Sequence, residues 1–369
     1  MRAIFATLLA LLTLAAPAAA QDYDTEEPRW SFAIHGGAGT IRRENMSAEQ
    51  EAEYRAALDA ALEAGSKILR EGGSAQDAVI AAITRLEDDP KFNAGRGAVF
   101  TWDGTIEHDA ALMDGRDRSA GAVTGTSTVR HPILLAREVM RDGRHVFLSG
   151  AGAEEFADRT DLERVPNDWF ETDSRRRALE RLKAEKLSAI DVDHKYGTVG
   201  AVALDMQGNM AAGTSTGGLT GKRWGRIGDA PVIGAGTYAD NRSCAVSATG
   251  AGEYFIRVGV AQEICTRLRL EPTGWSVYAP VDASSQTAAL TENSSKEEVI
   301  AAIYADIGTR AQRTADEVMA EVAELGGDGG VILVTPAGNA VFSFNTPGMY
   351  RGRATSKGVK EIAIFGEGE

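Results

Sequence analysis

The chain has 369 residues, 43% of them hydrophobic, which is enough for one large domain or two modest domains with a sizeable buried core. A formal net charge of −14 argues against nucleic acid or an anionic membrane as partner, because like charges repel each other. Small molecules or peptides are therefore the expected partners.

The first residues have the pattern of an export signal. Arg2 supplies a positive end, residues 4–15 form an apolar stretch, and the small residues 17–20 precede Gln21. The alternative is a membrane anchor, but the apolar run is shorter than the roughly 20 residues that span a bilayer. We therefore expect residues 1–20 to be a signal peptide and the mature protein to be periplasmic or secreted.

A strand and a glycine-rich turn are predicted next. Trp30 to Ile34 has the apolar character of a strand, and His35-Gly36-Gly37-Ala38-Gly39 has the composition of a turn. No P-loop lysine and no G-x-G-x-x-G pattern accompany these glycines. They are therefore expected to allow tight packing rather than to bind phosphate.

Two helices are expected after this turn, because each has a capping signal at its start. Ser47 with Gln50 marks the first helix, and Ser74 with Asp77 marks the second. Residues 92–129 are rich in glycine and short apolar runs, a composition typical of strands and loops.

A charged stretch follows between residues 167 and 194. It combines arginine, lysine and glutamate with few apolar residues, so it predicts a solvent-exposed linker that is helical in part. A second polar stretch, rich in serine and threonine, occupies residues 271–295.

Two later segments, residues 202–218 and 331–348, resemble each other. Each has an apolar run, a Gly-Asn turn and a second apolar run, which predicts a β-hairpin and hence antiparallel sheets. Residues 258–268 and 296–324 have helical patterns. Helices on either side of hairpins predict an α+β fold with its sheets in the middle.

Cys244 and Cys265 are the only cysteines in the chain. Neither belongs to a CxxC pair, so zinc binding and thioredoxin-like chemistry have no support. Two reduced thiols in the core are the default expectation, although an oxidising compartment would permit a disulfide without requiring one.

The first candidate for a catalytic motif fails on chain order. Residues 213–217 match the G-x-S-x-G nucleophile elbow, and His35-Gly36-Gly37 resembles the oxyanion strand of lipases. In that fold the catalytic histidine follows the serine, whereas every histidine here precedes Ser215. Their spacing also lacks an H-x-x-H or H-E-x-x-H metal pattern. We interpret them as ordinary polar residues: His35, His108, His131, His145 and His194.

A hydrolase without a usable histidine or cysteine pair can activate a threonine through that residue's own α-amino group. This amine has an unperturbed pKa of about 7.7 to 8.0 and lies within reach of the threonine Oγ. Cleavage of the chain must first liberate it. Gly197-Thr198 follows the charged linker and precedes the strand-like residues 199–204, and glycine leaves its carbonyl open to attack by the next hydroxyl. The sequence therefore predicts self-cleavage between these two residues.

A set of motifs, in order along almost the whole mature chain, resembles the plant-type asparaginase and isoaspartyl peptidase family of N-terminal-nucleophile (Ntn) hydrolases. Around the predicted cleavage point these are GTVGAVALDMQGNMAAGTSTGG, GRIGDAPVIGAGTYAD and SATGAGEYFIR. The others are AIHGGAGT, LEDDPKFNAGRGAVFTWDG, GGDGG and FNTPGMYRG. A single match would be weak evidence, but the ordered set is specific.

The resemblance implies a four-layer αββα Ntn-hydrolase sandwich made from two pieces of one chain. Residues 21–197, with a flexible linker at about 167–197, would form an α subunit, and residues 198–369 a β subunit. In similar proteins two αβ pairs associate into a dimer of heterodimers. The implied activity is hydrolysis of β-aspartyl (isoaspartyl) peptides and L-asparagine through an acyl-enzyme.

The resemblance also assigns the catalytic groups. Thr198 would be the nucleophile for self-cleavage and for substrate hydrolysis, and Thr216 would hydrogen-bond to it and polarise it. The Thr249 hydroxyl and the Gly250 N–H would form the oxyanion hole, directed at the charge that develops in the tetrahedral intermediate. Asn93 would help to hold the freed amine.

The implied substrate clamp consists of Arg226 and Asp229, with Gly218 and Gly252 beside them. A planar guanidinium suits the substrate's α-carboxylate, and the aspartate suits its α-ammonium group. This pair selects a free L-aspartyl head group and places the side-chain amide against Thr198. The bulky Lys222-Arg223-Trp224 segment before the clamp is expected to shape the rim of the pocket.

The resemblance implies no organic cofactor but a structural sodium ion. A hard cation held by carbonyl oxygens leaves almost no side-chain pattern, so this expectation rests on the match of residues 86–96 alone. The main-chain carbonyls would come from Leu86, Glu87, Asp89, Phe92, Ala94 and Arg96.

From spacing alone these residues also have ordinary explanations. Thr216 could be one more hydroxyl at a hairpin end, Arg226 with Asp229 a surface ion pair, and Thr249-Gly250 a turn. Three functions stay open on the sequence: an isoaspartyl peptidase with asparaginase activity, a glycosylasparaginase-like hydrolase, and an uncleaved protein that binds aspartyl groups. The opening HGGAGT motif favours the first over the second.

Overall fold

The computed structural model describes residues 29–185, 197–270 and 296–366. The expected signal peptide, the end of the expected linker and the polar stretch 271–295 lie outside these ranges. Within them the chain forms sheets and helices, so the prediction of a mixed α and β protein is confirmed.

The strands form two sheets. An eight-stranded sheet has the order β12-β11-β1-β5-β6-β2-β3-β4 and is antiparallel except for the β3–β4 pair, and a four-stranded antiparallel sheet has the order β10-β9-β8-β7. The strands are β1 (Ser31–Gly39), β2 (His108–Asp114), β3 (Ala120–Thr126), β4 (Phe147–Ser149), β5 (Val199–Leu204), β6 (Met210–Thr216), β7 (Thr237–Asp240), β8 (Cys244–Gly250), β9 (Gly329–Val334), β10 (Ala340–Phe344), β11 (Gly348–Thr355) and β12 (Lys360–Phe365).

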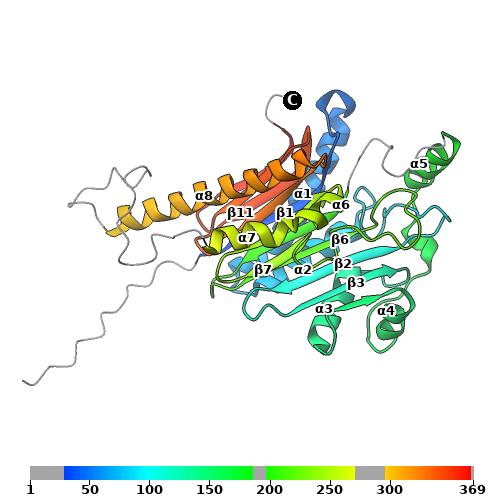
Figure 1. Cartoon of the computed structure of the whole chain (residues 1–369), viewed down its shortest axis with the longest axis horizontal. Helices are drawn as coiled ribbons and strands as arrows, with labels where there is room; N and C mark the ends of the chain where they lie inside the picture. Colours follow the sequence, from blue (N-terminus) through cyan, green and yellow to red (C-terminus); the bar gives the residue numbers. More distant parts are fainter. Residues whose placement is uncertain (1–28, 186–196, 271–295, 367–369) are drawn as a thin grey trace, which may run out of the picture.

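The helices lie on both sides of these sheets (Figure 1). They are α1 (Ala48–Arg70), α2 (Ala75–Asp88), α3 (Pro132–Asp142), α4 (Gly150–Ala157), α5 (Asp173–Ala184), α6 (Gly252–Val258), α7 (Val260–Leu270) and α8 (Lys296–Glu324), with 3₁₀ turns η1 (Arg43–Asn45) and η2 (Asn167–Phe170). In the three described ranges no helix combines the length and the apolar character that crossing a membrane requires.

The buried residues of the central strands alternate between neighbouring cores, as the two-residue period of a strand requires. Val199 and Ala201 of β5 face a core shared with α1, α2 and α3, whereas Val202 faces a core between the two sheets. On β9, Ile332 faces that inter-sheet core and Leu333 faces a third core with α7 and α8. Each central strand is thus covered on both faces, which holds its ends in fixed positions.

The predicted turn at residues 35–39 is wrong, because β1 continues through it to Gly39. The glycines pair with β11, with a bulge between His35 and Gly37. The expectation of tight packing is confirmed at Gly36, where a Cβ atom would lie 2.4 Å from the Phe92 ring. Glycine here permits a close approach of strand and loop rather than a reversal of the chain.

Both predicted hairpins are present as β5–β6 and β9–β10. The cap predictions also hold: the α1 start has a complete capping box between Ser47 and Gln50. At the start of α2, the Ser74 hydroxyl accepts the Asp77 N–H and donates to the Asp77 carboxylate, so only half of the box forms there.

The first half of the expected linker contains a helix, and most residues of that helix are exposed, as predicted, but three apolar side chains of this stretch are buried. Residues 167–184 contain η2 and α5, and Phe170, Leu179 and Leu182 are buried. The helix turns its few apolar residues toward the loop before β2, which the high charge of the segment concealed. Residues 186–196 lie outside the described ranges.

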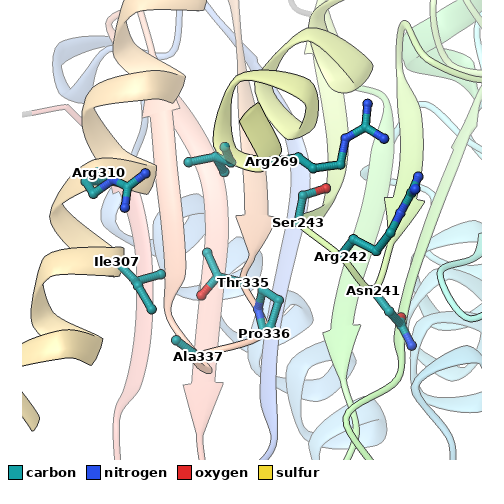
Figure 2. Close-up of a pocket in the computed structure, with 10 residues that line it drawn as sticks. Asn241, Arg242, Ser243, Arg269, Ile307, Arg310, Thr335, Pro336 and Ala337 are labelled. Atoms are coloured by element: carbon teal, nitrogen blue, oxygen red, sulfur yellow. The ribbon is translucent and has the colours of Figure 1, made fainter. Parts of the chain in front are cut away.

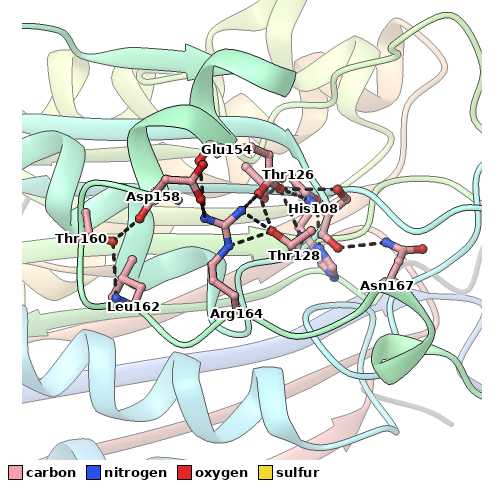
Figure 3. A network of polar contacts seen from close by, with 11 residues as sticks. His108, Thr126, Thr128, Glu154, Asp158, Thr160, Leu162, Arg164 and Asn167 are labelled. Atoms are coloured by element: carbon pink, nitrogen blue, oxygen red, sulfur yellow. Dashed lines mark hydrogen bonds and ion pairs between the residues drawn. The ribbon is translucent and has the colours of Figure 1, made fainter.

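A polar network anchors the chain between α4 and η2 (Figure 3). Arg164 pairs with Glu154 and with Asp158, and the Glu154 carboxylate accepts the Ser127 N–H beyond the end of β3. The Asn167 amide donates to the Ser127 carbonyl at 3.0 Å. These contacts tie the segment that precedes α5 to the eight-stranded sheet.

The default expectation of reduced thiols is wrong, because Cys244 and Cys265 form a disulfide. The bond joins the start of β8 to α7, and both residues are buried in the core on the outer face of the four-stranded sheet. The bridge therefore fixes a helix to the strand that carries Thr249.

Candidate active site

Thr198 lies immediately before β5, and its side chain meets that of Thr216 at the end of β6. The two strands are antiparallel neighbours, with Val199 opposite Ser215. The Thr198 hydroxyl donates to Thr216 Oγ1 at 2.9 Å, and the Gly218 N–H donates to the same oxygen at 3.0 Å. The predicted nucleophile and its predicted polarising partner are thus in direct contact.

The main chain on both sides of Thr198 is fixed by hydrogen bonds. The Gly197 carbonyl accepts the Asn93 N–H at 3.0 Å, and the Thr198 carbonyl bonds with His35 Nδ1 at 3.0 Å. Because burial lowers the pKa of His35 to about 3, its ring is neutral. A carbonyl only accepts, so Nδ1 carries the proton and Nε2 accepts from the Ser247 hydroxyl at 2.9 Å. His35 is therefore a buried support of the site rather than an ordinary polar residue.

Asn93 also holds the segment after Thr216. Its side-chain amide donates to the Gly218 carbonyl at 2.8 Å, its carbonyl oxygen accepts the Val99 N–H at 2.9 Å, and its main-chain carbonyl accepts the Gly217 N–H. In the uncleaved chain the Thr198 nitrogen belongs to a peptide bond. The predicted contact of Asn93 with a free amine therefore stays a prediction.

Thr249 and Gly250 end β8 on the side of the molecule where Thr198 begins β5. A Cβ atom on Gly200 would lie 2.0 Å from Ser247 Oγ, so these positions of β5 and β8 face each other. Thr198 lies two positions before Gly200, and Thr249 lies two positions after Ser247. Because side chains alternate along a strand, each of these threonines is on the same strand face as the residue it is counted from, toward the same end of the strands. The Thr249 hydroxyl is buried and has no hydrogen-bond partner within the described residues. It is free to serve an oxygen of a ligand.

Arg226 approaches the same region from the loop after β6. Its guanidinium forms a two-fold hydrogen bond with Glu253 of α6, from Nε to Oε1 and from Nη2 to Oε2, both at 2.9 Å. Its Nη1 lies 3.5 Å from the position of a Cβ atom on Gly218. The missing side chain of Gly218 thus leaves space between Arg226 and Thr216.

Asp229 is buried, and its Oδ2 has no hydrogen-bond partner within the described ranges. Burial raises the pKa of this carboxyl to about 7, and nearby Arg226 opposes that effect. A Cβ atom on Gly252 would lie 2.9 Å from Asp229 Oδ1. The alternative of a surface ion pair between Arg226 and Asp229 is wrong, because the arginine pairs with Glu253 and the aspartate is enclosed.

The Lys222-Arg223-Trp224 segment before Arg226 is buried at one end and exposed at the other. Trp224 is 95% exposed, whereas Lys222 is buried and donates to the Glu107 carbonyl at 3.0 Å. The Lys222 Nζ also lies 3.5 Å from the Cβ position of Gly218. The expected role of this segment at a pocket rim stays a prediction, while Lys222 places a second cation beside Arg226.

The loop expected to hold sodium wraps from the end of α2 toward Gly97. The carbonyls of Leu86, Glu87 and Asp89 accept main-chain N–H groups, and a Cβ atom on Gly97 would lie 2.4 Å from the Pro90 carbonyl oxygen. Converging carbonyl oxygens suit a hard cation. Residues 29–185, 197–270 and 296–366 contain no group of three or more His, Cys, Asp or Glu side chains suited to a metal. Any cation at this loop would thus depend on main-chain oxygens.

The Glu87 side chain has a separate role that the sequence did not indicate. It is fully buried, and its Oε1 accepts the Ser215 hydroxyl at 2.7 Å and the Ile133 N–H at 3.1 Å. Ser215 is next to Thr216, on the opposite face of β6. Glu87 therefore fixes the strand end that carries Thr216 from the helix side of the sheet.

We expect Glu87→Gln to gain stability relative to the wild type as the pH rises. Burial raises the pKa of Glu87 from 4.5 to about 8, so the folded protein keeps a proton that the unfolded chain loses between these values. In the wild type the free energy of unfolding therefore falls as the pH rises through that range, by at most about 1.4 kcal/mol per pH unit. The glutamine amide of the variant does not titrate and contributes no such decrease. Urea unfolding of both proteins at pH 5 and pH 8 measures this, and a constant difference between them would contradict a neutral buried Glu87.

One cavity of the described chain lies away from Thr198, and another borders Gly197. The cavity in Figure 2, about 340 Å³, is lined by Asn241 and Thr335 at the far ends of the strands, away from Thr216 and Gly250. A second cavity of about 390 Å³ borders Gly197 on the side of α1. Thr198 itself is buried, with 8% of its surface exposed, while it is joined to Gly197.

Comparisons with known proteins agree with the motifs. A family model described as asparaginase matches residues 28–294 and 290–364. The chain is 45% identical over 331 residues to the isoaspartyl peptidase of Escherichia coli, covering 87% of this chain and 91% of that protein. It is 46% identical over 231 residues to the isoaspartyl peptidase/L-asparaginase of Homo sapiens, covering 62% and 73%. It is also 36% identical over 363 residues to the probable isoaspartyl peptidase/L-asparaginase 2 of Arabidopsis thaliana, covering 91% and 99%.

Proposed function

Because the chain belongs to the asparaginase family, we propose that it is an enzyme that hydrolyses isoaspartyl peptides and L-asparagine with Thr198 as its nucleophile. The observation that carries the proposal is the 2.9 Å hydrogen bond from the Thr198 hydroxyl to Thr216, beside the unpartnered hydroxyl of Thr249. The names of the relatives favour this substrate class over glycosylasparagines.

Maturation would begin with attack of the Thr198 Oγ1 on the Gly197 carbonyl carbon. The acyl group moves from the Thr198 nitrogen to its oxygen, and water then hydrolyses the resulting ester. The products are a carboxylate on Gly197 and a free α-amine on Thr198, ending the α subunit (21–197) and beginning the β subunit (198–369). The hydrogen bond from the Asn93 N–H to the Gly197 carbonyl supports this step, because it orients the scissile group.

In the mature enzyme the freed amine would accept the proton of Thr198 Oγ1 as that oxygen attacks the substrate's side-chain amide carbon. The Thr249 hydroxyl and the Gly250 N–H would donate to the developing oxyanion. Collapse of the intermediate returns the proton to the departing nitrogen, which leaves as ammonia or as a peptide amine. Water hydrolyses the remaining ester and regenerates Thr198.

The clamp would set the specificity for a free aspartyl head group. Arg226 would bind the α-carboxylate through a charge-assisted hydrogen bond, and Asp229 would bind the α-ammonium group with its unpartnered Oδ2. Gly218 and Gly252 would leave room for the two ends of the substrate. Because burial raises the pKa of Asp229 to about 7, substrate binding should strengthen as the pH rises through neutrality and this carboxyl loses its proton.

Arg226→Ala is expected to raise KM for L-asparagine by about tenfold to a hundredfold, because the variant lacks the group proposed to bind the substrate's α-carboxylate. Chain cleavage should continue, because the Arg226 side chain binds Glu253 and not Gly197. Steady-state kinetics and a denaturing gel measure the two properties. Unchanged kinetics in the alanine variant would refute the clamp assignment.

N-terminal sequencing of the smaller fragment tests the proposal most directly. A fragment that begins at Thr198 supports it, whereas an intact chain favours an uncleaved protein that binds aspartyl groups. Parallel assays of the mature protein with β-aspartyl-leucine, L-asparagine and a glycosylasparagine then separate isoaspartyl peptidase from glycosylasparaginase activity.

We propose the four-layer αββα arrangement and a dimer of αβ heterodimers for the mature protein. The contacts of α1, α2 and α3 with the eight-stranded sheet, of the two sheets with each other, and of α7 and α8 with the four-stranded sheet support the layer order. Light scattering of the processed protein tests the assembly, and a mass of one αβ pair would exclude the dimer.

Two further proposals concern sodium and export. The main-chain carbonyls of the loop at residues 86–96 would hold Na⁺ as a structural ion, so replacing NaCl by choline chloride should lower the melting temperature, and no change would exclude the site. Residues 1–20 would direct export, which the disulfide supports because such bonds persist in oxidising compartments. A mature N-terminus at Gln21 tests the signal peptide, and an N-terminus that retains Met1 contradicts it.

A further inference from the structure

The two edges of the Arg226 guanidinium have different surroundings. One edge, formed by Nε and Nη2, binds both carboxylate oxygens of Glu253 at 2.9 Å. A guanidinium has five N–H donors, so the other edge, with Nη1, still has donors to offer. Glu253 lies in the first turn of α6, and its side chain is 44% exposed against 18% for Arg226.

The second edge of Arg226 lies beside two glycines, one of which contacts Thr216. Its Nη1 lies 3.5 Å from the Cβ position of Gly218 and 2.7 Å from that of Gly228, so a side chain at either residue would occupy the space next to it. The Gly218 N–H donates to Thr216, which accepts the hydrogen bond from Thr198. The free edge therefore borders the volume that the proposed substrate would fill.

Asp229 is a second carboxyl near Arg226, so the contact with Glu253 also decides which carboxylate the arginine binds. This carboxyl is buried, has one oxygen without a partner, and interacts electrostatically with Arg226. An arginine without another carboxylate would be drawn to it, because a bidentate pair with a buried aspartate is strongly favourable. Such a pair would neutralise both groups that are needed to bind the opposite ends of a zwitterion.

We infer that Glu253 is a positioning residue that holds Arg226 by one edge, keeps it apart from Asp229, and presents its other edge to the substrate's α-carboxylate. The inference rests on the proposed function, since it assigns the α-carboxylate to Arg226. The clamp is then a set of three residues, in which Glu253 acts on the substrate only through Arg226. Because Glu253 already fixes the Arg226 guanidinium in the free enzyme, substrate binding loses less side-chain conformational entropy.

The test uses the processed enzyme as wild type, Glu253→Ala and Glu253→Gln. Glu263→Gln is the matched control, because Glu263 of α7 binds Arg267 Nε at 2.8 Å in a similar ion pair on another helix. The two ligands are L-aspartate and β-alanine, which is aspartate without its α-carboxylate. Ligand titration followed by NMR gives both dissociation constants, and KM and kcat are measured with L-asparagine.

For Glu253→Ala we expect the dissociation constant of L-aspartate and KM for L-asparagine to rise about tenfold, with kcat within threefold of the wild type. Binding of β-alanine should stay within twofold, since it has no α-carboxylate for Arg226 to bind. Glu253→Gln keeps one acceptor oxygen and should show a smaller increase. The control should match the wild type in all four measurements.

Two results would overturn the inference while leaving the proposed function intact: L-aspartate binding within twofold of the wild type in both variants, or an equal loss for both ligands. The second would mean general damage to the loop, which a structural role of Glu253 would cause. If the alanine variant does not fold, the glutamine variant decides between the same outcomes. A wild type that neither cleaves itself nor hydrolyses L-asparagine would instead reject the proposed function.

Discussion

Thr198→Ala is expected to yield one uncleaved chain without measurable hydrolysis of L-asparagine or β-aspartyl dipeptides. The variant lacks the hydroxyl that donates to Thr216, and without cleavage at Gly197 no α-amine forms at position 198. The nucleophile and the proposed base are lost together, so kcat/KM should fall on the order of 10⁴-fold or more. A denaturing gel and an ammonia-release assay measure the two effects.

Thr198→Ser is the matched control, because serine keeps the hydroxyl and loses only a methyl group. It should cleave at the same junction and retain part of the activity. Processing of the alanine variant into the same two fragments would show that another group attacks the Gly197 carbonyl. Thr198 would then have no place in the mechanism.

Thr249→Val should separate activity from stability. Valine has nearly the shape of threonine but removes the hydroxyl proposed to bind the oxyanion, so kcat should fall about 10²-fold to 10³-fold with KM within a few-fold. The same hydroxyl is buried without a hydrogen-bond partner within the described residues. Its removal should therefore leave the melting temperature unchanged or raise it slightly. Kinetics and thermal unfolding of the processed enzyme measure both quantities.

Thr314→Val provides the control for this experiment. The Thr314 hydroxyl of α8 is also buried without a partner in the described chain, but it lies on the helix that covers the outer face of the four-stranded sheet. Its replacement should affect stability in the same direction and leave kcat unchanged. A Thr249→Val enzyme with full kcat, or one that loses stability while Thr314→Val does not, would contradict the oxyanion assignment.

The site concentrates groups that ordinary folding rules disfavour. The Thr249 hydroxyl and the Asp229 Oδ2 are buried without partners in the described chain, and Gly250 has a φ of 149° that other residues rarely adopt. Local sequence rules are expected to fail where a protein prepares to bind a ligand. The same rules hold at the helix starts and hairpins away from the site, such as Ser47 and the β9–β10 turn.

The sequence predicted the members of the site through motifs but missed the residues that support them. The sequence gives no sign that His35 supports the site, although its ring bonds to the Thr198 carbonyl across 163 positions of the chain. The motif that contains Glu87 points only to its main-chain carbonyl, although its side chain bonds to Ser215 across 128 positions. Glu253 lies inside a quoted motif, but nothing in that motif indicates its bond to Arg226.

By itself, the sequence predicted most of the local elements and indicated the candidate reactive groups. Helix caps, Gly-Asn turns and alternating apolar residues act over a few positions, so they can be read without a fold, and a Gly-Thr junction before a strand carries its own chemistry. The tertiary structure alone decided that β1 runs through its glycines, that the charged α5 segment packs, and that Cys244 meets Cys265. These outcomes depend on which distant surfaces become neighbours, because burial and hydrogen-bond partners are set by packing between elements far apart in the chain.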